Sequence, residues 1–188
     1  GGHGAGTTDE LLMQLRKRGH AIVDANYRKT SLFRLQTYDQ GRQFEDAVSI
    51  GTRYHNHAPE ETAVIGHSRG GLVIWRMLEL GWRFSAVFLF RPAMNRDFFL
   101  PLGQSNVHVI HRTDDRAIQW GGRLPFNDFG NAGRFGVDDS GFNAGRIHNV
   151  EAPRYANSDF WNHSGDFMYP QIHEWAEYIH GQLERVVA

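Results

Sequence analysis

The sequence predicts an α/β domain whose sheet is mostly parallel and carries helices on both faces. Strand-like runs alternate with amphipathic helical segments along the chain. The run at residues 61–68 (ETAVIGHS) is apolar without alternation, as in a strand that is buried on both faces. The chain has 188 residues, of which 40% are hydrophobic, so we expect residues 1–188 to form a single domain with one core.

Composition and charge narrow the classes of partner. The 20 basic and 21 acidic side chains nearly cancel, so no global attraction to nucleic acid is expected. The absence of cysteine excludes disulfides, thiolate metal sites and cysteine nucleophiles. No apolar run is long enough for an integral membrane segment, and no signal peptide is recognisable. We expect a soluble protein acting on a small molecule. A cytoplasmic location is favoured, although a chain without cysteine fits export equally.

The first half of the chain alternates helices with strands. Its expected elements are, in order, a helix over residues 8–18, a strand over 21–27, a helix over 43–57, a strand over 61–68 and a helix over 72–81. The first helix opens with the capping-box spacing of residues 7–10 (TTDE) and stops at Gly19. The last of these helices is strongly apolar and ends at Gly81.

The second half adds three strands and a terminal helix. Its expected elements are strands over residues 84–90 and 107–111, a long ordered loop over about 119–145, a strand over 146–150 and a terminal helix with Pro170 at its first position. The loop is rich in glycine, asparagine and aspartate, and its phenylalanines argue against disorder. The interval between Pro92 and Asn106 is too short for a helical cap domain.

The strongest chemical signal is the pattern Gly-x-Ser-x-Gly at residues 66–70. It lies between an apolar strand and an apolar helix, which is the context that a nucleophile elbow requires. The residues two positions before and after Ser68 must be small because a sharp turn brings the strand end close to the helix start. The turn presents the hydroxyl at the helix amino terminus, where the helix dipole favours developing negative charge. Ser68 is therefore the predicted nucleophile.

An acid and a histidine are expected on loops after later strands. Asp114 and Asp115 directly follow the strand over residues 107–111, and either could be the acid. Asp115 is preferred because residues 115–118 (DRAI) place a small apolar anchor shortly after the acid. His163 lies in a polar turn before the terminal helix and is the predicted base, with His173 as the alternative. His148 lies in a predicted strand, and four further histidines lie on or beside predicted helices: His20, His55, His57 and His180.

Two backbone N–H groups are needed to stabilise an oxyanion. One is expected from Arg69, the residue after the nucleophile. The other is expected from residues 2–6 (GHGAG), which resemble the H-G-x-G oxyanion loop of esterases and lipases. Ala5 is the preferred donor in that loop, with Gly4 as the neighbouring candidate.

Taken together, these motifs make the chain similar to members of the α/β-hydrolase superfamily over nearly its whole length. The resemblance implies a serine hydrolase with Ser68 as nucleophile, His163 as general acid and base, and Asp115 orienting the imidazole. It also implies strands before the oxyanion loop. Because the sequence opens at that loop, we expect a sheet that lacks its first strands. The superfamily acts on esters, lipids, thioesters and amides, so it does not determine the substrate.

A carboxylic ester with an apolar acyl group is the expected substrate, as for an esterase or lipase. The loop aromatics could line an acyl pocket or simply pack on the scaffold. They are Trp120, Phe126, Phe129, Phe135, Phe142, Phe160 and Trp161. A thioesterase, an amidase and a noncatalytic binding protein of the same fold remain alternatives.

Two other classes fit less well, and neither a cofactor nor a metal ion is expected. A dinucleotide-binding protein would use the glycines of residues 2–6 with Asp24, but Thr7 replaces the third glycine of its fingerprint. A metal hydrolase could use His108 and His111. Because they are three positions apart on a strand, they should face opposite sides of the sheet.

Overall fold

The computed structural model describes residues 8–23, 25, 40–121, 123, 130–154 and 163–187. Within these ranges four strands form one sheet in which all neighbouring strands are parallel. Their order in space follows the chain: β1 (Ala63–His67), β2 (Ala86–Phe90), β3 (Val107–His111) and β4 (Ile147–Glu151). The register pairs Ala63 with Ala86, Val87 with Val107, and Val107 with Ile147. All four strands therefore end at the same edge of the sheet.

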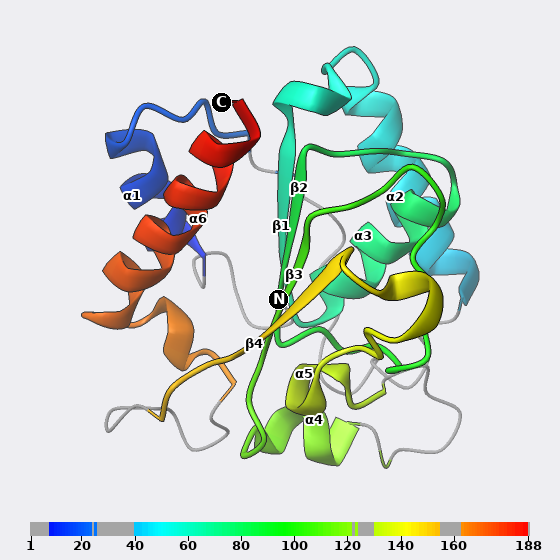
Figure 1. The fold of residues 1–188 in the computed structure, drawn as a ribbon, viewed down its shortest axis with the longest axis vertical. Helices are drawn as coiled ribbons and strands as arrows, with labels where there is room; N and C mark the ends of the chain where they lie inside the picture. Colours follow the sequence, from blue (N-terminus) through cyan, green and yellow to red (C-terminus); the bar gives the residue numbers. More distant parts are fainter. Residues whose placement is uncertain are drawn as a thin grey trace.

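Helices cover both faces of this sheet (Figure 1). The longer ones are α1 (Asp9–Lys17), α2 (Gln40–Tyr54), α3 (Arg69–Glu79) and α6 (Gln171–Val187). The pair α1 and α6 lies on one face, whereas α3 lies on the other with α2 packed against its outer side. The short helices α4 (Arg116–Gly121) and α5 (Ala132–Phe135) lie where the strands end, and three 3-10 turns complete the description: η2 (Pro59–Glu61), η3 (Gly141–Asn143) and η4 (Gly165–Phe167).

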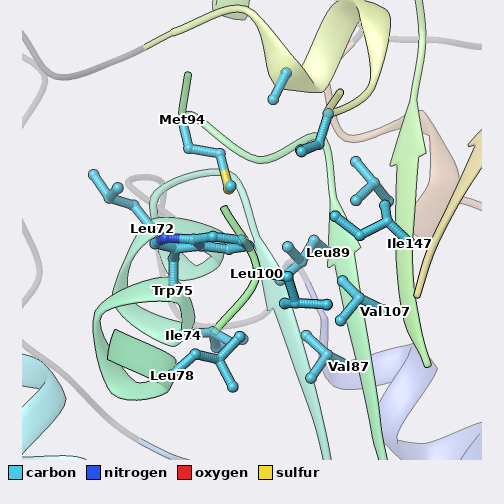
Figure 2. Packing of buried hydrophobic residues seen from close by; sticks show 13 residues of the cluster. Leu72, Ile74, Trp75, Leu78, Val87, Leu89, Met94, Leu100, Val107 and Ile147 are labelled. Atoms are coloured by element: carbon cyan, nitrogen blue, oxygen red, sulfur yellow. The ribbon is translucent and has the colours of Figure 1, made fainter. Parts of the chain in front are cut away.

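Two apolar clusters explain why the strands are apolar throughout. Alternate residues of each strand point to opposite faces. Val87 and Leu89 of β2 pack with Trp75 of α3, and Figure 2 shows these side chains in one layer. Phe88 and Phe90 pack with α1 and α6 on the other face. Every residue of β2 is buried, as expected for a central strand between two helical layers.

The predicted fold class is confirmed. The sheet is parallel, helices lie on both faces, and the described segment between β2 and β3 contains no helical cap. The strand predicted over residues 107–111 coincides with β3, and the other three lie within their predicted ranges or one residue beyond. No helix among the described residues is both long and apolar enough to cross a membrane.

Two sequence predictions need correction. Residues 21–23 and 25 belong to no strand, whereas a strand was predicted over 21–27. Ile22 instead packs against the apolar cluster under α1 and α6, so its burial needs no strand pairing. The stretch 119–145 is also not one loop, because it contains the end of α4, then α5 and η3. Buried Ala132 and Val137 anchor this stretch to the core.

Candidate active site

The turn between β1 and α3 holds Ser68 in a strained backbone conformation. Ser68 has φ 55° and ψ −120°, outside the regions that residues with side chains ordinarily adopt. Its N–H donates to the carbonyl of Phe90 at 2.9 Å, and its carbonyl accepts the N–H groups of Gly71 and Ala93, both at 3.1 Å. Three backbone hydrogen bonds thus hold the strained turn at the end of β1.

Steric contact explains the glycines around this serine. A Cβ atom on Gly66 would overlap the Cδ1 atom of Ile74 and lie 2.9 Å from the carbonyl of Gly70. A Cβ atom on Gly71 would lie 2.7 Å from the Cβ atom of Pro92. The strand end, the helix start and the segment after β2 therefore approach more closely than side chains allow. At Gly66 this is the packing that the Gly-x-Ser-x-Gly pattern predicts, whereas Gly71 lies one residue beyond the pattern.

Asp115 and His163 lie in direct contact. Nδ1 of His163 is 2.7 Å from Oδ2 of Asp115, whose other oxygen accepts the N–H of Ile118 at 2.9 Å. Asp115 is 0% exposed, and the side chain of His163 is 11% exposed. A carboxylate can only accept, so Nδ1 donates and Nε2 carries the lone pair of the neutral imidazole. This is the tautomer that a general base requires.

The neighbouring carboxylate has different partners. Asp114 accepts a hydrogen bond from Nη2 of Arg112 at 3.0 Å and also contacts Nε of that guanidinium. Arg154 lies 3.8 Å away, and the Asp114 side chain is 31% exposed. The structure therefore brings Asp115, and not Asp114, to His163.

His67 connects the histidine to the serine turn. It immediately precedes Ser68, and its Nε2 lies 3.0 Å from the backbone carbonyl of His163. The two imidazole rings lie 4.6 Å apart between centroids. Burial lowers the pKa of His67 well below its usual range, so this side chain is neutral and Nε2 donates to the carbonyl. His163 is thereby held beside the residue that precedes Ser68.

The remaining predicted site residues have different outcomes. Arg69 is the first residue of α3, and the N–H groups of a first helical turn have no acceptor within the helix. The predicted oxyanion donors Gly4 and Ala5 lie outside the described residues. His173, the alternative base, lies at the start of α6 and packs edge-on against Tyr169, so the structure pairs Asp115 with His163 instead.

Sequence reasoning missed two buried charged residues beside this pair. Arg91 follows β2 directly, and Asp166 lies in η4, three residues after His163. Both are 0% exposed, and Arg91 contacts Asp166 as well as Asp115. The available signals were an arginine at the end of an apolar strand and an acidic residue close to the predicted base. Neither has a diagnostic spacing.

A cavity of about 310 Å³ lies beside the acid loop. Its lining residues include Ile118, whose backbone binds Asp115, together with Asn95 and Arg134. Two of the predicted acyl-pocket aromatics, Trp120 and Phe142, are largely exposed. Phe135 packs against the guanidinium of Arg134. Phe126, Phe129, Phe160 and Trp161 lie outside the described residues.

A metal hydrolase would need a cluster of metal-binding side chains, and the part of the chain that the structure describes contains none. No group of three or more histidine, aspartate or glutamate residues there could hold a metal ion. His108 contacts the hydroxyl of Tyr178 on one face, whereas His111 contacts the backbone of Arg134 in α5. The glycines of the dinucleotide alternative and its Asp24 lie outside the described residues.

Comparisons of the chain with protein-family models, with curated proteins and with solved structures found no match. The function is therefore inferred from the geometry of this site.

Proposed function

We propose that the protein is a serine hydrolase that cleaves carboxylic esters through an acyl-enzyme on Ser68. One observation carries this proposal: a buried Asp115–His163 pair at 2.7 Å lies next to a strained serine turn between a strand and a helix. A nucleophile needs an adjacent base, and the base needs an orienting group. Ser68, His163 and Asp115 take these three roles.

In the proposed reaction, Oγ of Ser68 attacks the ester carbonyl carbon and its proton passes to Nε2 of His163. The tetrahedral intermediate then collapses, the bond to the alcohol oxygen breaks, and His163 returns the proton to that oxygen. Water next attacks the acyl-serine with His163 again acting as base. The carboxylic acid leaves and Ser68 recovers its proton.

The oxyanion is assigned to backbone donors. The N–H of Arg69 lies at the amino end of α3, where the helix dipole favours negative charge. We assign the second donor to the amino-terminal glycine-rich loop, with Ala5 preferred over Gly4. Both N–H groups would donate to the carbonyl oxygen, on which negative charge develops during acyl transfer.

The substrate assignment is an ester with an apolar acyl group. The cavity beside the acid loop adjoins the residue whose backbone binds Asp115, but its lining is mostly polar. The apolar acyl group therefore follows from the resemblance to esterases and lipases. A thioester or an amide would use the same steps with a different leaving group. A panel of p-nitrophenyl esters, acyl thioesters and anilides of increasing acyl length separates these classes.

The direct test is labelling with a fluorophosphonate probe, followed by peptide mapping of the modified residue. We expect the adduct on Ser68, and we expect Ser68→Ala to lower ester turnover by roughly 10⁴- to 10⁶-fold. His163→Ala should also abolish labelling, because the hydroxyl then has no base. Ser140→Ala, at an exposed position before η3, is the matched control and should retain labelling.

Two results would overturn the proposal. One is unchanged hydrolysis by Ser68→Ala. The other is the absence of labelling in protein that circular dichroism shows to be folded, which would favour a noncatalytic binding protein of this fold.

A further inference from the structure

A buried arginine joins two carboxylates beneath His163. Arg91 is 0% exposed and lies directly after β2. Its Nε lies 2.7 Å from Oδ2 of Asp166, and its Nη2 donates to Oδ1 of the same carboxylate at 2.9 Å. Its Nη1 lies 3.7 Å from Oδ2 of Asp115, the oxygen that accepts from His163. One guanidinium is therefore shared between two acids.

Asp166 belongs to the same segment as the proposed base. It lies in η4 and is fully buried, and burial raises its pKa while the charge of Arg91 opposes that rise. We take Asp166 as ionised at neutral pH because Arg91 contacts both of its oxygens. Two contacts to one buried cation also fix the position of η4 relative to β2.

We infer that Arg91 and Asp166 are positioning residues that leave the negative charge of Asp115 available to His163. The inference rests on the proposed function, since it concerns the base of that reaction. Asp166 neutralises Arg91 and so prevents the guanidinium from cancelling Asp115.

A charge count makes this inference testable. Asp115, Asp166 and Arg91 sum to one negative charge, which becomes zero when His163 takes a proton. Without the charge of Asp166, Arg91 and Asp115 would sum to zero, and the imidazolium would form beside a neutral pair. Charges in a buried site are poorly screened, so this difference should change the stability of the imidazolium.

Several groups bear on the protonation of His163. Among the described residues they include Asp115 before α4, His67 in β1, Arg91 after β2, Asp166 in η4, and Arg112 after β3, which acts on Asp166. His67 contributes no charge, because burial keeps it neutral. The Arg91 and Asp166 pair can therefore be varied while the other groups stay in place.

The test compares two variants by NMR titration of the His163 imidazole, assigned with the help of His163→Gln. Asp166→Asn should lower the titration midpoint of His163 by about one pH unit, because one buried negative charge is lost. The double variant Arg91→Met with Asp166→Leu removes both charges and restores the count of minus one. Its midpoint should return close to that of the unmodified protein. Replacing a buried ion pair by apolar side chains is often tolerated.

Activity provides a second measurement. The acid limb of the kcat/KM profile should move to lower pH in Asp166→Asn and return in the double variant. If the two residues had only a structural role, removing both charges would not return the acid limb to its original pH. Asp138→Asn, a carboxylate-to-amide change at an exposed position, is the matched control and should leave both readouts unchanged.

The outcomes separate this inference from the proposed function. Equal His163 midpoints in folded Asp166→Asn and unmodified protein would overturn the inference, even if Ser68 is labelled. A shifted midpoint that the double variant does not restore would also overturn the charge count. Shifted and restored midpoints without labelling of Ser68 would support the charge arrangement and reject the hydrolase proposal.

Discussion

Asp114 and Asp115 have the same side chain and adjacent positions, yet their surroundings give them different properties. Asp115 is fully buried, so its interaction with His163 is poorly screened. Asp114 is partly exposed, and Arg112 occupies its oxygens. The sequence leaves both open because each follows β3. Which of the two carboxylates contacts His163 depends on which side chain points into the core. The hydrogen bond from the N–H of Ile118 orients Asp115 in that direction.

This difference predicts unequal effects of the same substitution. Asp115→Asn preserves the volume but removes the charge that stabilises the imidazolium, so we expect kcat/KM to fall by about 10³- to 10⁴-fold. Asp114→Asn should change kcat/KM by less than about threefold, because solvent screens that carboxylate. Ester turnover and the rate of fluorophosphonate labelling measure both. A larger loss in Asp114→Asn than in Asp115→Asn would contradict the assignment.

At the scale of elements, the nucleophile turn depends on the close approach of β1 and α3. We expect Gly66→Ala to destabilise the protein by about 2 kcal/mol or more, because its Cβ atom would press against the backbone of Gly70 and the side chain of Ile74. Labelling of Ser68 should fall as well. Gly181→Ala in α6 is the matched control, since its Cβ atom would meet nothing within 4 Å.

The control should move stability in the opposite direction. Alanine favours a helix over glycine, so Gly181→Ala should stabilise the protein by about 0.5 to 1 kcal/mol. Urea denaturation at constant pH measures both variants. If Gly66→Ala were as stable as the unmodified protein, the steric account of the turn would be wrong.

The elements that sequence predicted best are those with local causes. The β-branched run of β3 and the apolar spacing of α3 are encoded within a few residues, and both were predicted. The prediction at residues 21–27 was wrong over its described part because a strand needs a partner, and Ile22 is partly buried against the cluster under α1 and α6 without one. Pairing is a tertiary property that a short apolar run does not reveal.

The candidate site divides in the same way. The sharp turn at Ser68 was predictable because its steric demands appear as glycines at fixed spacing. The contact between Asp115 and His163 spans 48 residues and depends on where two loops fold. Arg91 and Asp166 are 75 residues apart, and neither carries a local pattern. Sequence could therefore nominate the acid and the base, but it could not identify the charges that surround them.

At the scale of the whole molecule, packing helices on both faces of the sheet buries histidines that must stay neutral. His108 in β3 is stacked against Phe88 and against His148. Its Nε2 donates to Oδ1 of Asn106 at 2.8 Å, and the hydroxyl of Tyr178 donates to its Nδ1 at 2.7 Å. Burial, and then the nearby His148, lower the pKa of His108 to about 4. The folded protein thus binds this proton more weakly than the unfolded chain does.

The sign of the linkage follows from that pKa. Between pH 6.5 and about pH 4 the unfolded chain binds more protons than the folded protein at this site, so stability rises with pH across that window. The contribution of His108 is fully present above pH 6.5 and is lost as pH falls towards 4. Its size is on the order of 3 kcal/mol. His67, whose pKa is also lowered by burial, adds a loss of the same sign.

We therefore predict that His108→Gln flattens the pH dependence of the unfolding free energy between pH 6.5 and 4, although it lowers stability at pH 7. Glutamine can donate to Asn106 and accept from Tyr178, but it has no proton to gain. Phe88→Leu removes packing from the same cluster without changing a titrating group, so it should lower stability while keeping the slope. Urea denaturation at half-unit pH intervals gives both slopes. A slope in His108→Gln equal to that of the unmodified protein would show that the proton responsible lies elsewhere, with His67 the next residue to vary.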